Sequence, residues 1–282
     1  LTVLYGFAKA QEFQVQIPKE MIQKAWKYLV SEYKLRYEID LKNNKLLSYH
    51  FVTFLNYTLS CYQPEYYQDT FTLQQRQEML EYSFSNWRKL SPYLKAYLAM
   101  TLHRMYRPQD AELVLASIMD SAITTEDQGT HWAREDRSWL WYNDNIESHA
   151  QILRTLQEVT PNNTEHTDGL ILWLLLNKKF NQWKSTKATA EVLYSLLYVM
   201  KKQDALAKQE TATITIADKQ HHYIFEPDNY TGNHNQIVFS SHEVTPEMAT
   251  VKAQKTGPGY LFTSMTWHFS TDQMPSTPYG DY

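Results

Sequence analysis

The segment of residues 124–144 carries the side chains best suited to chemistry. Within it we single out His131, Trp132, Trp139, Trp141 and Asp144 as a candidate binding surface. Further carboxylates stand nearby, at Glu126, Asp127, Glu135 and Asp136. Two carboxylates about 5 to 9 Å apart, beside aromatic platforms for sugar, would suit a glycosidase. The alternative is a long solvated turn that its tryptophans hold against the domain, since carboxylates scattered along one loop do not by themselves form an acid/base pair.

The cysteine and histidines offer weaker candidates. Cys61, the single cysteine, excludes an internal disulfide. It ends a predicted helix, where it is either a reactive thiol activated by a neighbouring base or a small packed side chain. Adjacent His221 and His222 would point to opposite faces of a strand, and no His-Glu-x-x-His motif occurs. His50 and His103 lie in apolar helical patterns, which are typical of hydrogen-bonded core or interface histidines more than of general bases. We therefore expect no catalytic residue, cofactor or metal site.

Composition excludes several classes of protein. The formal net charge of −4, without any long basic cluster, argues against a nucleic-acid surface. No apolar run approaches the roughly 20 residues that span a bilayer, so we expect no membrane span. The sequence opens at Leu1, without methionine or a signal peptide and already in an apolar pattern. This opening leads us to expect a piece of a longer protein.

Helical periodicity fills the chain up to about residue 204. Apolar residues at helical spacing, with prolines at several first-turn positions, predict helices over residues 1–11, 18–33, 46–62, 71–87, 92–105, 108–123, 145–159, 165–176 and 186–202. Residues 34–45 are interpreted as a polar connection. The first helix of each successive pair recurs at roughly 40 to 53 residues, the repeat of a two-helix unit. Stacked hairpins form an open solenoid or close into an α/α toroid.

Residues 183–200, WKSTKATAEVLYSLLYVM, favour the toroid. Ser185 or Thr186 is suited to cap the helix. Beyond the cap, Ala188, Val192, Ser195 and Val199 form one stripe, and Ala190, Leu193, Leu197 and Met200 form another. A helix that is apolar on two faces is expected to be packed inside a domain.

The periodicity changes after residue 209. Alternation of apolar and polar residues predicts about five strands, in residues 211–220, 221–227, 236–244, 248–256 and 259–270. We therefore predict a mainly α chain with a C-terminal β part. Residues 1–204 would form an α/α toroid, residues 205–270 a small or partial β-sandwich, and residues 271–282 a linker or tail.

Several stretches resemble the thioester-domain region of the bacterial alpha-2-macroglobulin family. They are LTVLYGFAKAQEFQVQIPKEMIQKAWKYL, WLWYNDNIESHAQILRTLQEV, GLILWLLLNKKFNQWKSTKATAEVLYSLL and the closing GPGYLFTSMTWHF. The third is the closest match, because its apolar helix, basic turn, tryptophan and STK-x-TA cap follow the family order. In its details, including the closing TWHF, the sequence is most similar to macroglobulin-like proteins of Bacteroidetes type.

The resemblance implies a periplasmic or cell-surface lipoprotein that traps proteases after a bait region is cut. Its partners would be target proteases and neighbouring domains of the same longer chain. Many members acylate the protease through a Cys-x-Glu-Gln thioester, but Cys61 is followed by Tyr62, Gln63 and Pro64. We therefore expect a non-enzymatic scaffold or binding domain without a thioester in this chain. The alternatives are a glycan-binding or glycan-cleaving toroid that uses residues 124–144, and a helical interaction module unrelated to proteases.

Overall fold

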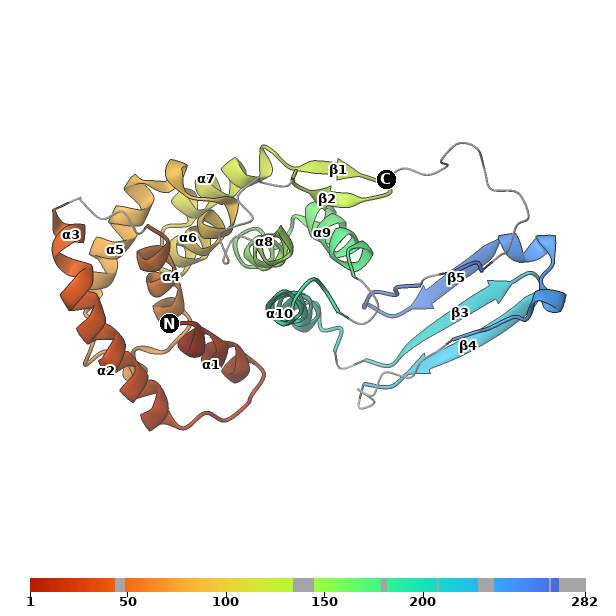
Figure 1. Ribbon diagram of the computed structural model, residues 1–282, viewed down its shortest axis with the longest axis horizontal. Helices are drawn as coiled ribbons and strands as arrows, with labels where there is room; N and C mark the ends of the chain where they lie inside the picture. The colour runs from red at the N-terminus through yellow and green to blue at the C-terminus, as the bar shows by residue number, and fades with distance from the viewer. Residues whose placement is uncertain are drawn as a thin grey trace. The chain divides into compact units, whose positions relative to one another are not determined.

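The computed structural model describes residues 1–43, 49–133, 145–178, 182–206, 208–227, 236–263 and 265–268. These residues are mainly helical, with a small antiparallel sheet near the C-terminal end (Figure 1). The chain divides into two compact units, Leu1–Gln203 and Asp204–Tyr282. The sequence predicts a boundary between residues 204 and 205, ahead of the change of periodicity after residue 209.

The described part of the first unit contains helices and one short hairpin. Its helices are α1 (Thr2–Glu12), α2 (Lys19–Arg36), α3 (Glu38–Lys42), α4 (Tyr49–Ser60), α5 (Leu73–Ser85), α6 (Pro92–Arg104), α7 (Pro108–Met119), α8 (Asn145–Val159), α9 (Thr164–Leu176) and α10 (Thr186–Lys202). Two strands, β1 (Ile123–Thr125) and β2 (Gly129–His131), pair between α7 and α8.

Local capping sets where several helices begin. Thr72 and Gln75 form a reciprocal capping box at the start of α5. The hydroxyls of Ser91 and Ser185 accept hydrogen bonds from backbone N–H groups in the first turns of α6 and α10. These contacts satisfy donors that a helix start otherwise leaves free. They explain why the predicted starts of α6 and α10 agree with the structure.

Two predictions for the first unit were wrong. Residues 34–45 are not simply a connection, because α2 continues to Arg36 and α3 occupies Glu38–Lys42. The beginning of the segment at residues 124–144 is not a loop, because β1 and β2 form an antiparallel hairpin there. Strands of three residues are too short to show a period-two pattern.

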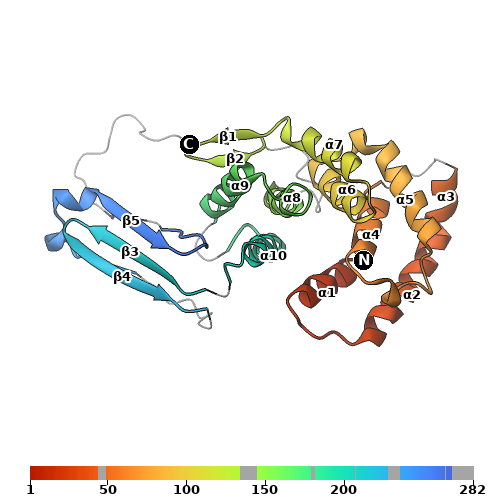
Figure 2. The same cartoon turned by 180° about the vertical axis from the view of Figure 1, so that it is seen from behind.

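Five helices, α1, α4, α6, α8 and α10, contact one another in sequence, and we call them the inner helices. Helix α4 packs on α6, α6 on α8, and α8 on α10. Helix α1 joins the two ends of this series, because the Tyr5 ring contacts Tyr57 of α4 and its hydroxyl donates to Glu191 of α10 at 2.7 Å. Lys201 of α10 also donates to the backbone oxygen of Glu12 at 2.9 Å. The same helices can be followed from behind in Figure 2.

Helix α10 is fully buried on one face and partly covered on the other. The predicted stripe of Ala188, Val192, Ser195 and Val199 is buried, and Trp183 packs before the cap with its Nε1 donating to the backbone oxygen of Leu174. The second predicted stripe is not fully covered, since Leu193 is 47% exposed. The expectation of two buried faces was therefore wrong for the face that carries Leu193.

The β1–β2 hairpin lies against α9 at a very close approach of backbones. A Cβ atom added to Gly129 would stand 2.1 Å from the backbone oxygen of Gly169. A Cβ atom added to Gly169 would stand 2.2 Å from Oγ1 of Thr130. Gly129 also has a φ of +71°, which favours glycine over other residues. Glycine at both positions therefore allows the hairpin to pack on α9.

The described part of the second unit forms one three-stranded antiparallel sheet in the order β4-β3-β5. The strands are β3 (Glu210–Ile216), β4 (Lys219–Phe225) and β5 (Val251–Thr256). The strands predicted in residues 236–244 and 259–270 are absent where these residues are described. Residues 236–240 have no regular structure and Ser241–Glu243 forms a 3-10 turn. Alternation along the chain does not ensure that a segment finds a pairing partner.

Candidate functional site

The described half of the segment at residues 124–144 does not form an open binding surface. Trp132 is only 8% exposed, and its Nε1 donates to the backbone oxygen of Ile118 at 2.9 Å. This burial corrects the expectation that Trp132 offers a platform to a ligand. His131 is half-buried beside the backbone oxygen of Gly129, and Glu126 and Asp127 lie exposed in the hairpin turn. The remaining candidates, Glu135, Asp136, Trp139, Trp141 and Asp144, lie outside the described residues.

His149 is a packed, neutral histidine beneath Trp132. Its ring stacks on Trp173 at 3.7 Å between centroids. Its Nδ1 lies 2.7 Å from the backbone oxygen of Asn145, and its Nε2 accepts from the backbone N–H of Trp132 at 3.2 Å. Both ring nitrogens are therefore engaged with Nδ1 carrying the proton. Burial lowers the pKa of His149 to about 3.

Acid is expected to destabilise the protein through His149. The unfolded chain binds a proton on this ring below pH 6.5, whereas the folded chain does so only near its pKa of about 3. The contribution of His149 is therefore fully present above pH 6.5 and is lost as pH falls, by about 2 kcal/mol at pH 5. Urea unfolding at pH 7 and pH 5 measures this loss. A His149→Gln variant should lose less stability over the same interval; an equal loss would contradict the prediction.

A polar network lies where the inner helices face one another, buried at its centre and open at the end that carries Lys202. Each of three helices contributes residues at spacings of four, three and four, which place them on one face. These residues are Glu147, Gln151, Arg154 and Glu158 on α8; Glu191, Ser195, Tyr198 and Lys202 on α10; and Tyr93, Tyr97, Met100, whose Sδ accepts from Gln151, and Arg104 on α6. Helix α1 adds Tyr5, Lys9 and Glu12, helix α4 adds Tyr57, and the turn that follows α4 adds Cys61. We refer to these residues as the central network.

An ion pair between Arg104 and Glu158 joins α6 to α8. Nε of Arg104 donates to Oε1 of Glu158, and Nη2 donates to Oε2 at 2.7 Å. Burial alone would raise the pKa of the Glu158 carboxyl, but the charge and hydrogen bonds of Arg104 outweigh burial and lower it. Glu158 is therefore ionised at neutral pH and is unsuited to act as a general acid.

Lys9 and Glu12 bring charges of α1 into the network. The fully buried Nζ of Lys9 donates to the hydroxyl of Tyr57 at 3.1 Å and lies 3.6 Å from Glu12. Burial, together with the charge of Arg154, lowers the pKa of Lys9 to about 8. Nη2 of Arg154 donates to both carboxylate oxygens of Glu12 at 2.6 Å. Charges on α1 and α8 are thus paired away from solvent.

Glu191 is the carboxyl whose surroundings favour the protonated form. It is buried in α10 and accepts from the Tyr5 hydroxyl. Burial raises the pKa of Glu191, although the hydrogen bond of Tyr5 acts in the opposite direction. A raised carboxyl pKa can indicate a general acid. Because Glu191 is only 5% exposed, its position in the fold favours a structural role.

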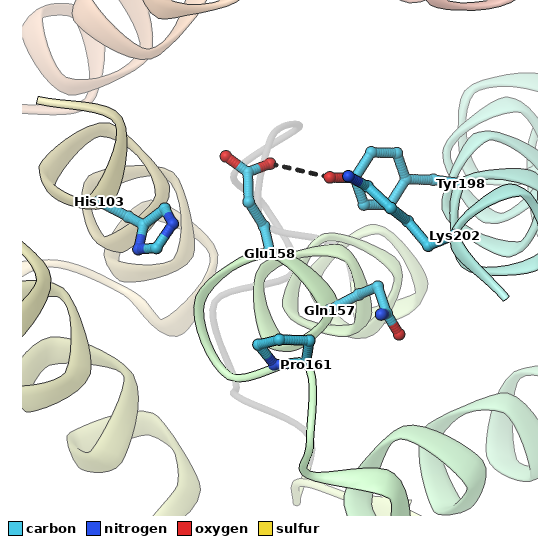
Figure 3. A pocket seen from close by; sticks show the side chains of 6 residues that line it. All are labelled: His103, Gln157, Glu158, Pro161, Tyr198 and Lys202. Atoms are coloured by element: carbon cyan, nitrogen blue, oxygen red, sulfur yellow. Dashed lines mark hydrogen bonds between the residues drawn. The ribbon is translucent and has the colours of Figure 1, made fainter.

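A pocket of about 530 Å³ opens at the end of the network where α6, α8 and α10 terminate. Figure 3 shows its lining residues: His103, Gln157, Glu158, Pro161, Tyr198 and Lys202. The Tyr198 hydroxyl donates to Oε2 of Glu158 at 3.3 Å. The buried Nδ1 of His103 has no hydrogen-bond partner within the described residues. His103 is therefore not the fully bonded core histidine that its helical pattern predicts.

The remaining candidates from the sequence do not assemble a reactive centre. Cys61 is half-buried, and its Sγ lies 3.2 Å from Nη1 of Arg104, which joins it to the network. His50 is exposed on α4, which excludes the core position among its two expected roles and leaves the interface role as a prediction. His222 lies 3.0 Å from the Thr213 hydroxyl, on a neighbouring strand. In the part of the chain that the structure describes, no group of three or more His, Cys, Asp or Glu is placed to hold a metal.

The central network was missed by the sequence reasoning, although a signal was present. Lys9 follows Tyr5 by four residues on the face of α1 that is otherwise apolar. Arg154 and Glu191 likewise stand on faces that bury apolar neighbours. Charges placed on the core faces of several helices predict a shared polar interior, because isolated buried charges are strongly unfavourable.

Comparisons with known proteins add no assignment. No protein-family model matches this chain, and no curated protein matches it. Among the described residues, no helix is long and apolar enough to cross a membrane.

Proposed function

We propose that this chain is the thioester-domain-like region of a bacterial macroglobulin-like protein that traps proteases. In this proposal the longer protein is periplasmic or at the cell surface as an anchored lipoprotein, and its partners are target proteases. The chain itself acts as a scaffold that binds neighbouring domains and catalyses no reaction. The motifs of residues 139–159 and 169–197 that resemble this family supply the assignment.

The contact between α1 and α10, the first and last inner helices, supports the proposal that the first unit is a closed toroid. An open solenoid has no reason to bring α1 against α10, whereas a closed α/α toroid requires it. Tyr5 donates to Glu191, and the Phe13 ring stacks on Tyr194 at 6.3 Å between centroids. We therefore interpret the first unit as an α/α toroid, with the three-stranded sheet as one layer of a partial β-sandwich.

The central network supports a scaffold role. Its carboxylates at Glu12 and Glu158 are each held by an arginine that keeps them ionised. Such pairs hold two helices in a fixed relation, because separating the partners would leave a buried charge unpaired. A rigid toroid of this kind would transmit a movement of neighbouring domains as a unit.

The proposal is tested on the longer polypeptide that contains this sequence. Protease treatment should cut its bait region and make the particle more compact in small-angle scattering. The trapped protease should keep cleaving a small peptide substrate, because its active site stays free, but should lose access to a large protein substrate. A protease inactivated beforehand is the matched control and should cause no compaction.

Two results would overturn this function. An unchanged scattering profile after complete bait cleavage would exclude a trap that closes on its target. Equal loss of activity toward the small and the large substrate would show blockage of the protease active site instead of steric enclosure.

A further inference from the structure

Helix α2 presents a row of exposed apolar side chains to solvent. Met21, Tyr28 and Leu35 are 49%, 68% and 74% exposed. They stand seven residues apart, so they lie almost on one line along the helix. The opposite side of α2 buries Ile22, Trp26, Leu29 and Tyr33. Helix α2 runs along the outer edge of the helical unit in both views (Figures 1 and 2).

The row suits a second helix as its partner. Two helices pack along a seam of two positions in every seven, and Met21, Tyr28 and Leu35 supply one apolar position of each pair. Met21 and Leu35 are about 21 Å apart along the helix axis, at 1.5 Å per residue. Two helices can pack over this length. The area that they bury is small, which is typical of weak association.

The charges beside the row are arranged symmetrically about Tyr28. Lys24 pairs with Glu20 at 3.9 Å, on the N-terminal side of Tyr28. Arg36 pairs with Glu32 at 2.9 Å, on the C-terminal side. Lys24 and Glu32 are each four residues from Tyr28, and Glu20 and Arg36 are each eight residues from it. Positions related by this symmetry carry opposite charges.

We propose that a second copy of this chain binds here, with the two α2 helices antiparallel and a two-fold axis at Tyr28. In this register Met21 meets the Leu35 position of the second copy, and Lys24 lies across from the Glu32 position. A two-fold interface is self-complementary, so each such contact occurs twice. A parallel pair would instead bring Lys24 to Lys24 and Glu32 to Glu32. The charge pattern therefore selects the antiparallel arrangement, independently of the proposed protease-trapping function.

Sedimentation of the chain over a wide concentration range tests the interface. We expect monomer at about 1 µM and dimer at about 1 mM, the behaviour of a small interface. Leu35→Glu should weaken dimerisation at least about tenfold, because it places a carboxylate in the apolar seam. Leu113→Glu on α7 is the matched control, since Leu113 is 50% exposed on another helix; it should leave dimerisation unchanged. Circular dichroism confirms that both variants fold.

A charge exchange tests the register. Lys24→Glu and Glu32→Lys should each weaken the dimer several-fold, because each creates like charges across the interface. The double variant carries both exchanges and should recover most of the lost affinity, since opposite charges face each other again. This recovery is expected only from the antiparallel pair. If the double variant instead loses as much affinity as the two single variants together, the proposed register is wrong.

Other results would overturn the interface itself. A chain that stays monomeric at the highest concentration would show that this face has another occupant or none. A dimer that survives Leu35→Glu would use a different surface. Binding of the monomer to vesicles of phosphatidylcholine and phosphatidylserine, lost in Leu35→Glu, would assign the row to a membrane surface instead.

Discussion

Replacing Arg104 by methionine is expected to lower the free energy of unfolding by about 3 to 5 kcal/mol. The substitution leaves the Glu158 carboxylate without the two hydrogen bonds that hold it ionised. The side chains of Arg104 and Glu158 are only 19% and 13% exposed, so water replaces those bonds poorly. Chemical denaturation at pH 7 measures the difference.

A second variant separates the lost pair from the lost packing. Arg104→Met combined with Glu158→Met removes both charges and should recover a large part of the stability, because no unpaired charge remains. Lys42→Met is the surface control, since Lys42 pairs with Glu38 at 3.3 Å from a largely exposed position. It should cost less than about 1 kcal/mol. A similarly small effect of Arg104→Met would mean that solvent reaches Glu158.

Replacing Gly129 by alanine is expected to destabilise the protein by about 2 to 5 kcal/mol, through overpacking and backbone strain together. The new methyl group would meet the backbone oxygen of Gly169 at 2.1 Å, and the φ of +71° disfavours alanine. Gly169→Ala should cost a similar amount, because its methyl group would meet Thr130 at 2.2 Å. Both variants should also disturb the packing of Trp132, which shifts its fluorescence emission.

Gly6 offers the matched control for these alanine substitutions. It lies inside α1, and a Cβ atom added there meets nothing within 4 Å. Gly6→Ala should therefore be neutral or stabilise the protein by up to about 1 kcal/mol, because alanine favours the helix. Comparable destabilisation at Gly6 and Gly129 would show that the close approach of the hairpin to α9 is not the cause.

Local signals predicted the helices well and the strands less well. Prolines, hydroxyl caps and helical periodicity lie within the segment they describe, which is why α6 and α10 begin where they were predicted. Strand β3 pairs with β4 through a tight turn, but also with β5, where Thr211 lies opposite Thr256. Pairing over such a separation depends on the whole unit. Alternation in residues 236–240 could not reveal that no strand forms there.

The candidate site was predicted less well than the fold. The aromatic residues of the segment made Trp132 a candidate for ligand binding. Its indole is instead buried, where it donates to the backbone oxygen of Ile118 and contacts the ring of His149. The central network depends on contacts between distant helices, such as that between Tyr5 and Glu191. Each residue of such a pair has an ordinary helical context of its own. Only the packing of the inner helices brings them together.

The contact between α1 and α10 has a consequence for synthesis on the ribosome. Lys201 and Glu12 are separated by 189 positions in the chain. At about 5 to 20 residues per second, the nascent α1 waits roughly 10 to 40 s before its partner on α10 is made. The other partners are made sooner, since Tyr57, which accepts from Lys9, lies 48 positions after it, and Arg154, which pairs with Glu12, lies 142 positions after it. Within this chain, α1 can pack on α2 and α4 early, but its contact with α10 forms only once residues 186–202 have been made.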